Sequence, residues 1–224
     1  MTDGDEGRGP RRAQKRGLSP LTVLGVVLLV AGLGCLGYVG WEFYGTTWIS
    51  KRAADEERAG LAARWERPEA VQEEPTAGQA EWLLRIPALG DDYEWPIVAG
   101  VEPDDLTRGV GWYPTSALPG EIGNFALAGH RVTNGEPFRH LLDLEVGDEV
   151  IVETAEAIFT YEINSAPREL TVQDTESWVL LPVPGQEGVV PSESVITLTT
   201  CQDFFRSPDR SVGFGVLTDT ELKK

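Results

Sequence analysis

Cys201 is the one side chain beyond residue 44 that could serve as a thiol nucleophile. It ends the stretch VITLTTC, and the other cysteine, Cys35, lies in an apolar N-terminal segment, so Cys201 has no intramolecular disulfide partner. A free cysteine is commonly a small, buried apolar residue. A thiol becomes a strong nucleophile as a thiolate, which a neighbouring imidazole or cation favours. The surroundings of Cys201 therefore decide between an inert and a reactive thiol.

Two histidines and two arginines are candidate partners of this thiol. His130 ends the apolar stretch NFALAGH, whereas His140 lies in PFRHLL, which predicts a short apolar helix. Arg206 falls in a predicted turn, whereas Arg210 opens the last predicted strand, whose antiparallel return brings it beside the end of VITLTTC. Either histidine alone is more often structural than catalytic. Together, Cys201, His130 and Arg210 would supply a nucleophile, an acid/base and an oxyanion donor.

The stretch that carries the thiol alternates as a half-buried strand does. Ile196 and Leu198 face one side, whereas Thr199 and Cys201 face the other, so the thiol leaves the strand opposite the core residues. Arg210 shares the parity of apolar residues in its own strand. If those residues face the core, Arg210 must leave the strand at the rim.

The elements that would position these residues are short strands separated by turns. Gly, Pro and Asp interrupt apolar or alternating runs from residue 81 onward, which is typical of a sandwich or barrel rather than a parallel α/β sheet. One helical turn is expected near Pro103. The predicted strands cover 82–87, 93–98, 124–130, 148–154, 158–165, 195–200 and 211–217.

Residues 166–193 form the longest irregular connection of the domain. A connection of this length is commonly functional or disordered, and its apolar residues, Trp178 and Leu180 among them, argue against disorder. We therefore expect a packed loop with a helical turn that forms one wall of a groove.

The N-terminal segment is long and apolar enough to cross a bilayer as a helix. No charge lies between Arg16 and Glu42, and basic residues precede the segment, which places the N-terminus in the cytoplasm. A cleaved signal peptide would need a small-x-small site, which is missing, and a lipoprotein anchor on Cys35 would need a large aliphatic residue at Gly32. The expected organisation is a cytoplasmic tail (1–17), a transmembrane signal anchor (18–44), an extracellular stalk (45–80) and a catalytic domain (81–224).

The predicted stalk is charged and poor in large apolar residues. Its first part favours helix to about Glu66, since Ala, Glu and Arg are good helix formers, and Pro68 and Pro75 argue against helix beyond that point. We expect a solvated spacer that holds the domain off the membrane.

The whole chain carries a formal net charge of −17. This charge repels phosphate backbones, so nucleic acid is not an expected partner. Otherwise an acidic surface indicates mainly solubility.

The candidate catalytic residues sit in a combination of motifs that resembles a known family. LAGHRVTNGEPFRHL, followed about seventy residues later by TLTTC and then Arg210, resembles the sortases, membrane-anchored cysteine transpeptidases of Gram-positive bacteria. The resemblance covers about residues 81–218. The wording GHR-x-T-x-G-x-PFR is most similar to class E, the housekeeping type of high-GC actinobacteria. It implies an all-β fold, a closed eight-stranded barrel with short helices and the active site at the ends of two central strands.

The resemblance also implies a reaction and a role for each residue. Cys201 would attack the Thr–Gly bond of a C-terminal LAxTG- or LPxTG-like sorting signal on a secreted protein. His130 would act as the acid/base and Arg210 would hold the substrate and the oxyanion. An amine of a lipid II-type peptidoglycan precursor would then release the acyl-enzyme, with no metal or organic cofactor. The residues expected to contact the substrate are Thr199, Thr200, Trp178 and Leu180.

Departures and rival families limit this interpretation. No Asp-Pro-aromatic lid motif precedes the barrel, and only Glu187 and Glu193 lie near the substrate loop, so neither a lid nor calcium is expected. An L,D-transpeptidase would carry Ser-x-Gly-Cys-x-Arg, which TLTTCQDF lacks. The non-enzymatic alternative is a membrane-tethered β-barrel binding module in which Cys201 is inert and resists alkylation.

Overall fold

The computed structural model describes residues 19–41, 45–67, 74–201 and 207–223. It divides into two compact units at Gly40. The first contains helix α1 (Pro20–Gly40), whose 21 residues bear no charge. By its length and apolar composition, α1 is a candidate membrane-spanning helix.

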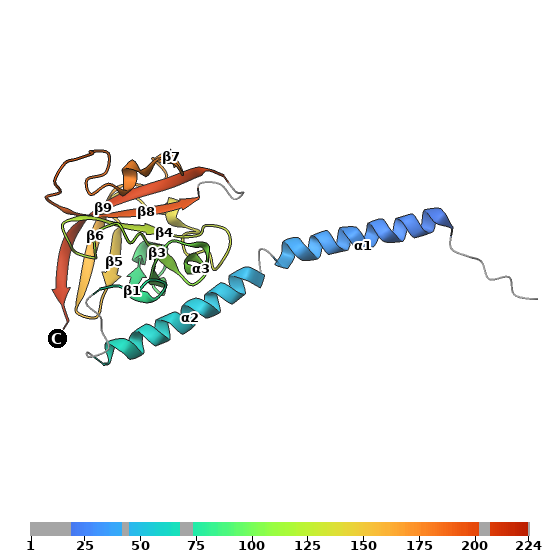
Figure 1. The fold of residues 1–224 in the computed structure, drawn as a ribbon, viewed down its shortest axis with the longest axis horizontal. Helices are drawn as coiled ribbons and strands as arrows, with labels where there is room; N and C mark the ends of the chain where they lie inside the picture. The colour runs from blue at the N-terminus through green and yellow to red at the C-terminus, as the bar shows by residue number, and fades with distance from the viewer. Residues whose placement is uncertain (1–18, 42–44, 68–73, 202–206, 224) are drawn as a thin grey trace, which may run out of the picture. The chain divides into compact units, whose positions relative to one another are not determined.

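The second unit is built around a closed β-barrel (Figure 1). The sheet runs in the order β6-β5-β1-β2-β3-β4-β8-β9, and pairing of β6 with β9 closes it into eight strands, as predicted. A short ninth strand, β7, pairs with the start of β9. The strands are β1 (Ala80–Arg85), β2 (Glu94–Ala99), β3 (Val110–Trp112), β4 (Gly123–Ala128), β5 (Glu149–Glu153), β6 (Ala157–Ser165), β7 (Thr171–Gln173), β8 (Ser194–Cys201) and β9 (Asp209–Leu222).

Short helical turns fill the connections. The helix expected near Pro103 is α3 (Pro103–Leu106). It begins with a capping box formed by Glu102 and Asp105. The stretch PFRHLL forms only a 3-10 turn, η4 (Leu141–Asp143), so the predicted helix is shorter than expected. The remaining turns are η3 (Pro87–Leu89) and η5 (Ser177–Leu180).

Alternate residues of the strands fill the barrel. Ile196 and Leu198 are fully buried in this core, as the alternation of β8 predicted. Trp82 makes edge-to-face contacts with Trp112 at 5.3 Å and with Phe125 at 5.5 Å between ring centroids.

A second, smaller apolar cluster lies apart from this core. Val172 and Val179 of the long connection pack with Val212 of β9 in this cluster, with Trp178 and Phe214 at its edge. Residues 166–193 are therefore a packed wall, with η5 as the expected helical turn.

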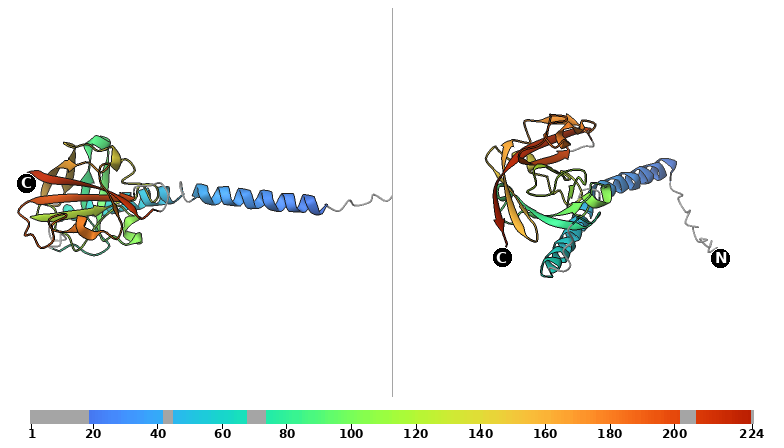
Figure 2. Two further views of the ribbon diagram at one scale, coloured as in Figure 1. Left: turned by 90° about the horizontal axis from the view of Figure 1, so that it is seen from above. Right: turned by 60° about the vertical axis from the view of Figure 1, so that its left-hand side comes forward.

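Helix α2 (Thr46–Trp65) occupies the segment predicted to be a solvated stalk. The helix itself matches the sequence pattern, but it packs along β1 and β2 rather than standing in solvent (Figures 1 and 2). Ala54 and Leu61 are buried, at 3% and 1% exposure. Two half-buried ion pairs join the helix to the barrel, Arg58 with Glu94 at 3.2 Å and Glu57 with Arg108 at 2.9 Å.

Candidate active site

The pairing of β8 with β9 sets the candidate nucleophile against the candidate oxyanion donor. Cys201 lies directly opposite Arg210, and Thr199 lies opposite Val212. Directly opposite residues of an antiparallel pair project from the same face of a sheet. The structure thus places the backbone of Cys201 beside that of Arg210, while its side chain lies outside the described atoms.

His130 follows β4, the strand that pairs in parallel with β8. Ala128 of β4 pairs with Thr199, and Gly129 continues the ladder by donating its N–H to the carbonyl of Thr199 at 3.1 Å. The hydroxyl of Thr200 donates to the carbonyl of Gly129 at 2.8 Å. His130 therefore leaves β4 at the level of Cys201, and β8 lies between the strands that carry His130 and Arg210.

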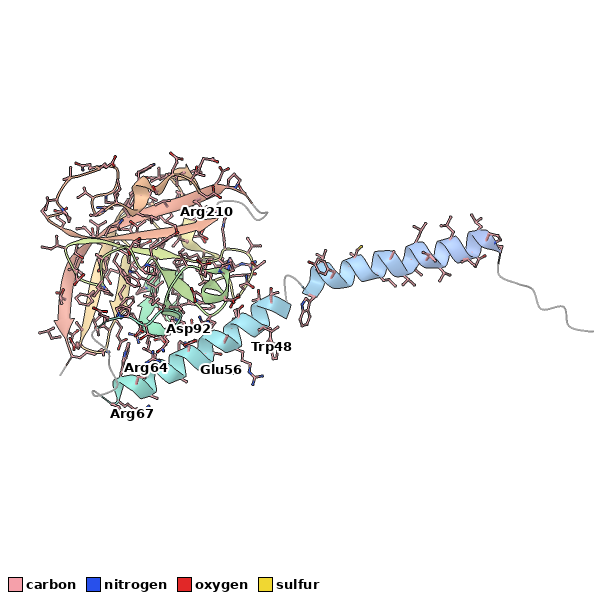
Figure 3. All side chains as sticks on the ribbon, in the orientation of Figure 1. Trp48, Glu56, Arg64, Arg67, Asp92 and Arg210 are labelled. Atoms are coloured by element: carbon pink, nitrogen blue, oxygen red, sulfur yellow. The ribbon has the colours of Figure 1, made fainter. Side chains whose placement is uncertain are left out.

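The parity of β9 no longer conflicts with a catalytic Arg210. Val212 and Phe214 belong to the second cluster, under the wall formed by residues 166–193, and not to the barrel core. Arg210 shares their face, at the start of β9 (Figure 3). It need not leave the strand at the rim, because its neighbours of the same parity face the second cluster rather than the barrel core.

Arg210 is fastened by the turn that precedes β9. Its Nη1 donates to the carbonyls of Ser207 at 2.6 Å and Asp209 at 3.1 Å, and its Nη2 lies 3.6 Å from a carboxylate oxygen of Asp174. Preorganised donors are what an oxyanion site requires. The rival arginine, Arg206, lies outside the described residues.

His130 sits in a half-buried environment that favours the neutral ring. Burial lowers the pKa of its imidazole below the ordinary value for histidine. The side-chain Nδ2 of Asn134 lies 3.2 Å from its Nε2. His140, in contrast, is exposed beside η4, where its Nδ1 lies 2.9 Å from a carboxylate oxygen of Asp143.

A pocket of about 290 Å³ opens beside Arg210. Leu180 and Thr199, two of the residues expected to contact substrate, line it together with Arg210. The hydroxyl of Thr199 donates to the carbonyl of Leu127, so this residue also fixes β8 to β4. Tyr113 lines the pocket as well. Sequence reasoning missed Tyr113, because the preceding strand β3 is only three residues long and shows no alternation.

The other two expected contacts lie elsewhere. Thr200 is 2% exposed, and its hydroxyl donates to the carbonyl of Gly129. This bond fixes the backbone immediately before His130. Trp178 packs on Phe214 of β9, with ring centroids 6.5 Å apart, and so helps to join the wall to β9. Neither residue lines the pocket.

A buried asparagine that sequence reasoning missed ties the wall to the barrel. Asn124 of β4 is 1% exposed, and its Nδ2 donates to the carbonyls of Val179 and Leu181, each at 3.0 Å. Its Oδ1 accepts from the hydroxyl of Thr197 at 2.6 Å. The only sequence signal was a polar residue that shares the outward parity of Ala126 and Ala128.

Comparisons with known proteins agree with this geometry. Residues 84–218 match the model of the sortase domain. Over 97% of its length the chain is 30% identical to sortase SrtE2 of Streptomyces coelicolor, covering 90% of that protein. It is 33% identical over 96% of its length to sortase SrtE1 of the same organism, of which it spans 62%.

Solved structures show the same relationship. Sortase E of Streptomyces avermitilis is 34% identical, with a TM-score of 0.59 over 66% of this chain and 93% of that one. Sortase E1 of S. coelicolor, solved with a tripeptide in its active site, is 36% identical, with a TM-score of 0.57 over 66% and 94%. With its closed barrel and its match over residues 84–218, this chain belongs to the sortase family, and these relatives support its place in class E.

Proposed function

We propose that this protein is a membrane-anchored cysteine transpeptidase. It cleaves a C-terminal LAxTG- or LPxTG-like sorting signal between Thr and Gly and transfers the new carboxyl group to an amine of a cell-wall precursor of the lipid II type. The observation that supports the proposal is the backbone register of β8, which ends at Cys201. This strand pairs with β4, which runs into His130, and with β9, in which Arg210 lies opposite Cys201.

The first half-reaction forms a thioacyl enzyme. The thiolate of Cys201 attacks the threonine carbonyl carbon, and the guanidinium of Arg210 stabilises the resulting oxyanion. His130 donates a proton to the glycine nitrogen as the C–N bond breaks. Because burial lowers the pKa of His130, its imidazolium is a stronger acid than an exposed histidine would be.

The second half-reaction regenerates the enzyme. The incoming amine attacks the thioester carbonyl and gives a proton to the neutral ring of His130. The amide bond forms, the C–S bond breaks, and the thiolate of Cys201 returns. The neutral ring is the majority form at neutral pH, which suits it to accept this proton.

The pocket beside Arg210 is the proposed site of the sorting signal. Leu180 and Val179 give it apolar surface, and Thr199 and Tyr113 add polar groups. Such a lining suits a short extended peptide with one apolar anchor and several backbone groups. The tripeptide in the active site of the S. coelicolor sortase E1 structure supports a peptide ligand in this family.

We place the barrel outside the plasma membrane, with α1 as a single-pass anchor and residues 1–17 in the cytoplasm. The basic residues that precede α1 support this orientation. Within residues 45–80, α2 belongs to the catalytic unit, so the structure leaves little of this segment to act as a free spacer.

Incubation of the purified full-length chain with LAxTG and LPxTG peptides and a primary amine tests the proposal. We expect a transpeptidation product by mass spectrometry, a trapped thioester at Cys201, and neither from a folded Cys201→Ala variant. Failure of Cys201 to form the adduct, or to react with iodoacetamide, would instead favour the binding module with an inert cysteine.

A further inference from the structure

The loop that follows His130 folds back on the imidazole ring. The N–H of Phe138 donates to the carbonyl of His130 at 2.9 Å, and the N–H of Glu136 donates to the carbonyl of Thr133 at 3.2 Å. These bonds close residues 131–137 into a compact turn. At its tip, Asn134 turns its side-chain amide onto Nε2 of His130, at 3.2 Å.

The backbone of this tip is unusual. Asn134 and Glu136 are the two non-glycine residues with positive φ among the described residues, at 53° and 56°. L-residues rarely adopt this left-handed conformation, and Asn tolerates it better than most. The conformation directs the chain so that the short Asn134 side chain reaches back four residues to His130.

Packing from two other elements holds the tip in place. A Cβ at Gly135 would lie 3.0 Å from the ring of Trp95 in β2 and 3.4 Å from the Cβ of Ser50 in α2. The hydroxyl of Tyr93 donates to the carbonyl of Pro137 at 2.7 Å. The loop is therefore supported by the barrel and by α2, and Asn134 has a fixed platform.

We propose that Asn134 is a positioning residue that fixes the ring orientation and the tautomer of His130. A neutral imidazole has one N–H donor and one acceptor nitrogen. Because the Asn134 amide nitrogen can only donate, Nε2 must accept, and the proton of the neutral ring resides on Nδ1. This inference rests on the proposed role of His130 as acid/base.

The contact distinguishes the two charge states of the ring. When His130 becomes an imidazolium, both of its nitrogens are donors. The N–H of the Asn134 amide would then face another N–H, so the contact favours the neutral ring, in the same direction as burial does. An aspartate could only accept, and a glycine could do neither.

Asn134→Gly and Asn134→Asp distinguish the effect of the side-chain amide from the effect of the left-handed backbone. Glycine adopts the left-handed conformation without steric cost, so Asn134→Gly should fold. The matched control is Glu136→Gly, which changes the other left-handed residue of the loop and whose side chain pairs with Arg139 rather than His130.

The readout is ¹⁵N NMR of the full-length, histidine-labelled chain in a membrane mimetic, together with steady-state kinetics. The chain contains only two histidines, and His140 serves as an internal reference. In the wild type at neutral pH we expect the Nδ1–H tautomer at His130. Asn134→Gly should lose that signature, and Asn134→Asp should move the proton to Nε2.

We expect Asn134→Gly to lower kcat roughly tenfold, the scale of losing a group that orients a reactive histidine, with KM for the peptide little changed. Glu136→Gly should retain both the tautomer and kcat. An equal loss of kcat in Glu136→Gly, or an unchanged His130 spectrum in Asn134→Gly, would overturn the inference. If the wild type shows the expected tautomer but is inactive, the proposed function is wrong, whereas the contact between Asn134 and His130 is still supported.

Discussion

His130 and His140 differ in their surroundings, and that difference favours His130 over His140 for the proposed role of acid/base. His130 is half-buried at the end of β4, where burial lowers its pKa, whereas His140 is exposed beside Asp143. A lowered pKa in the folded state means that the unfolded chain binds the proton more readily. Acidification through the ordinary histidine range should therefore remove a little stability, and it should also convert His130 to the form that cannot accept a proton.

Alanine at these two positions should give opposite results. We expect His130→Ala to lower kcat/KM by about 10²–10⁴-fold, because it removes the positioned proton transfer. His140→Ala should retain most activity. Peptide transfer and the melting temperature are measured together, and a larger activity loss in His140→Ala at unchanged melting temperature would reverse the assignment.

Arg210 should not tolerate lysine. Lysine keeps the charge but loses the planar fork of donors that now engages the Ser207 and Asp209 carbonyls. We expect Arg210→Lys to lower kcat/KM about 10²-fold or more, the scale of deleting an oxyanion donor.

The control is Arg52→Lys, on the exposed pair with Glu56, which should leave kcat/KM unchanged. Arg206→Ala should also cost far less than Arg210→Ala. Near-full turnover by Arg210→Ala, with an inactive Arg206→Ala, would show that Arg206 and not Arg210 is the oxyanion donor.

At the scale of elements, the sequence predicted what local pattern determines. The alternation of Ile196 and Leu198 identified the core face of β8, and the turn chemistry around Pro208 identified the start of β9. β3 and β7 escaped prediction because three residues are too few to show a period of two. The resemblance, rather than the pattern alone, gave the closed barrel.

Other features could not be predicted, because they depend on partners distant in sequence. Thr200 is an expected substrate contact, and the structure adds a bond that the sequence does not reveal, from its hydroxyl to the carbonyl of Gly129, 71 residues earlier. The charges of α2 looked solvated, yet Arg58 and Glu57 find partners on the barrel. Asn134 gave no signal, because its left-handed backbone appears only in the folded loop.

The docking of α2 should contribute to the stability of the catalytic unit. Leu61 is 1% exposed on the face of α2 that meets the barrel. We expect Leu61→Ala to lower the free energy of unfolding by about 2–4 kcal/mol, the usual cost of truncating a buried leucine. Arg52→Ala, at an exposed position of the same helix, should change it little.

Urea unfolding of the full-length chain, followed by tryptophan fluorescence, measures both variants. If Leu61→Ala unfolds at the wild-type urea concentration, then α2 is a spacer that does not stabilise the barrel.

The wall formed by residues 166–193 should determine whether the enzyme prefers Ala or Pro at the second position of the sorting signal. Leu180 and Val179 line the pocket, and Asn124 fixes their backbone to β4. Replacement of residues 166–193 by the corresponding loop of an LPxTG-cleaving enzyme should shift the ratio of kcat/KM for LAxTG and LPxTG peptides. An active chimaera with an unchanged ratio would place the specificity elsewhere.

At the scale of the whole molecule, the charge on each side of α1 should decide which way the chain faces. Five basic residues precede α1, whereas Lys51, Arg52 and Arg58 lie within about 20 residues after it, the range over which such charges act. In the proposed orientation this bias would keep the N-terminus in the cytoplasm. It is modest, because α2 carries basic residues on the other side of α1.

Replacing Arg11, Arg12, Lys15 and Arg16 with glutamine should therefore leave more basic residues after α1 than before it. We expect a clear fraction of chains to invert, with the barrel inside the cell and protected from protease added to intact protoplasts. The matched control removes Lys51 and Arg52, both exposed on α2, which should strengthen the native orientation. Full protease access in both variants would show that α1 is oriented by something other than these charges.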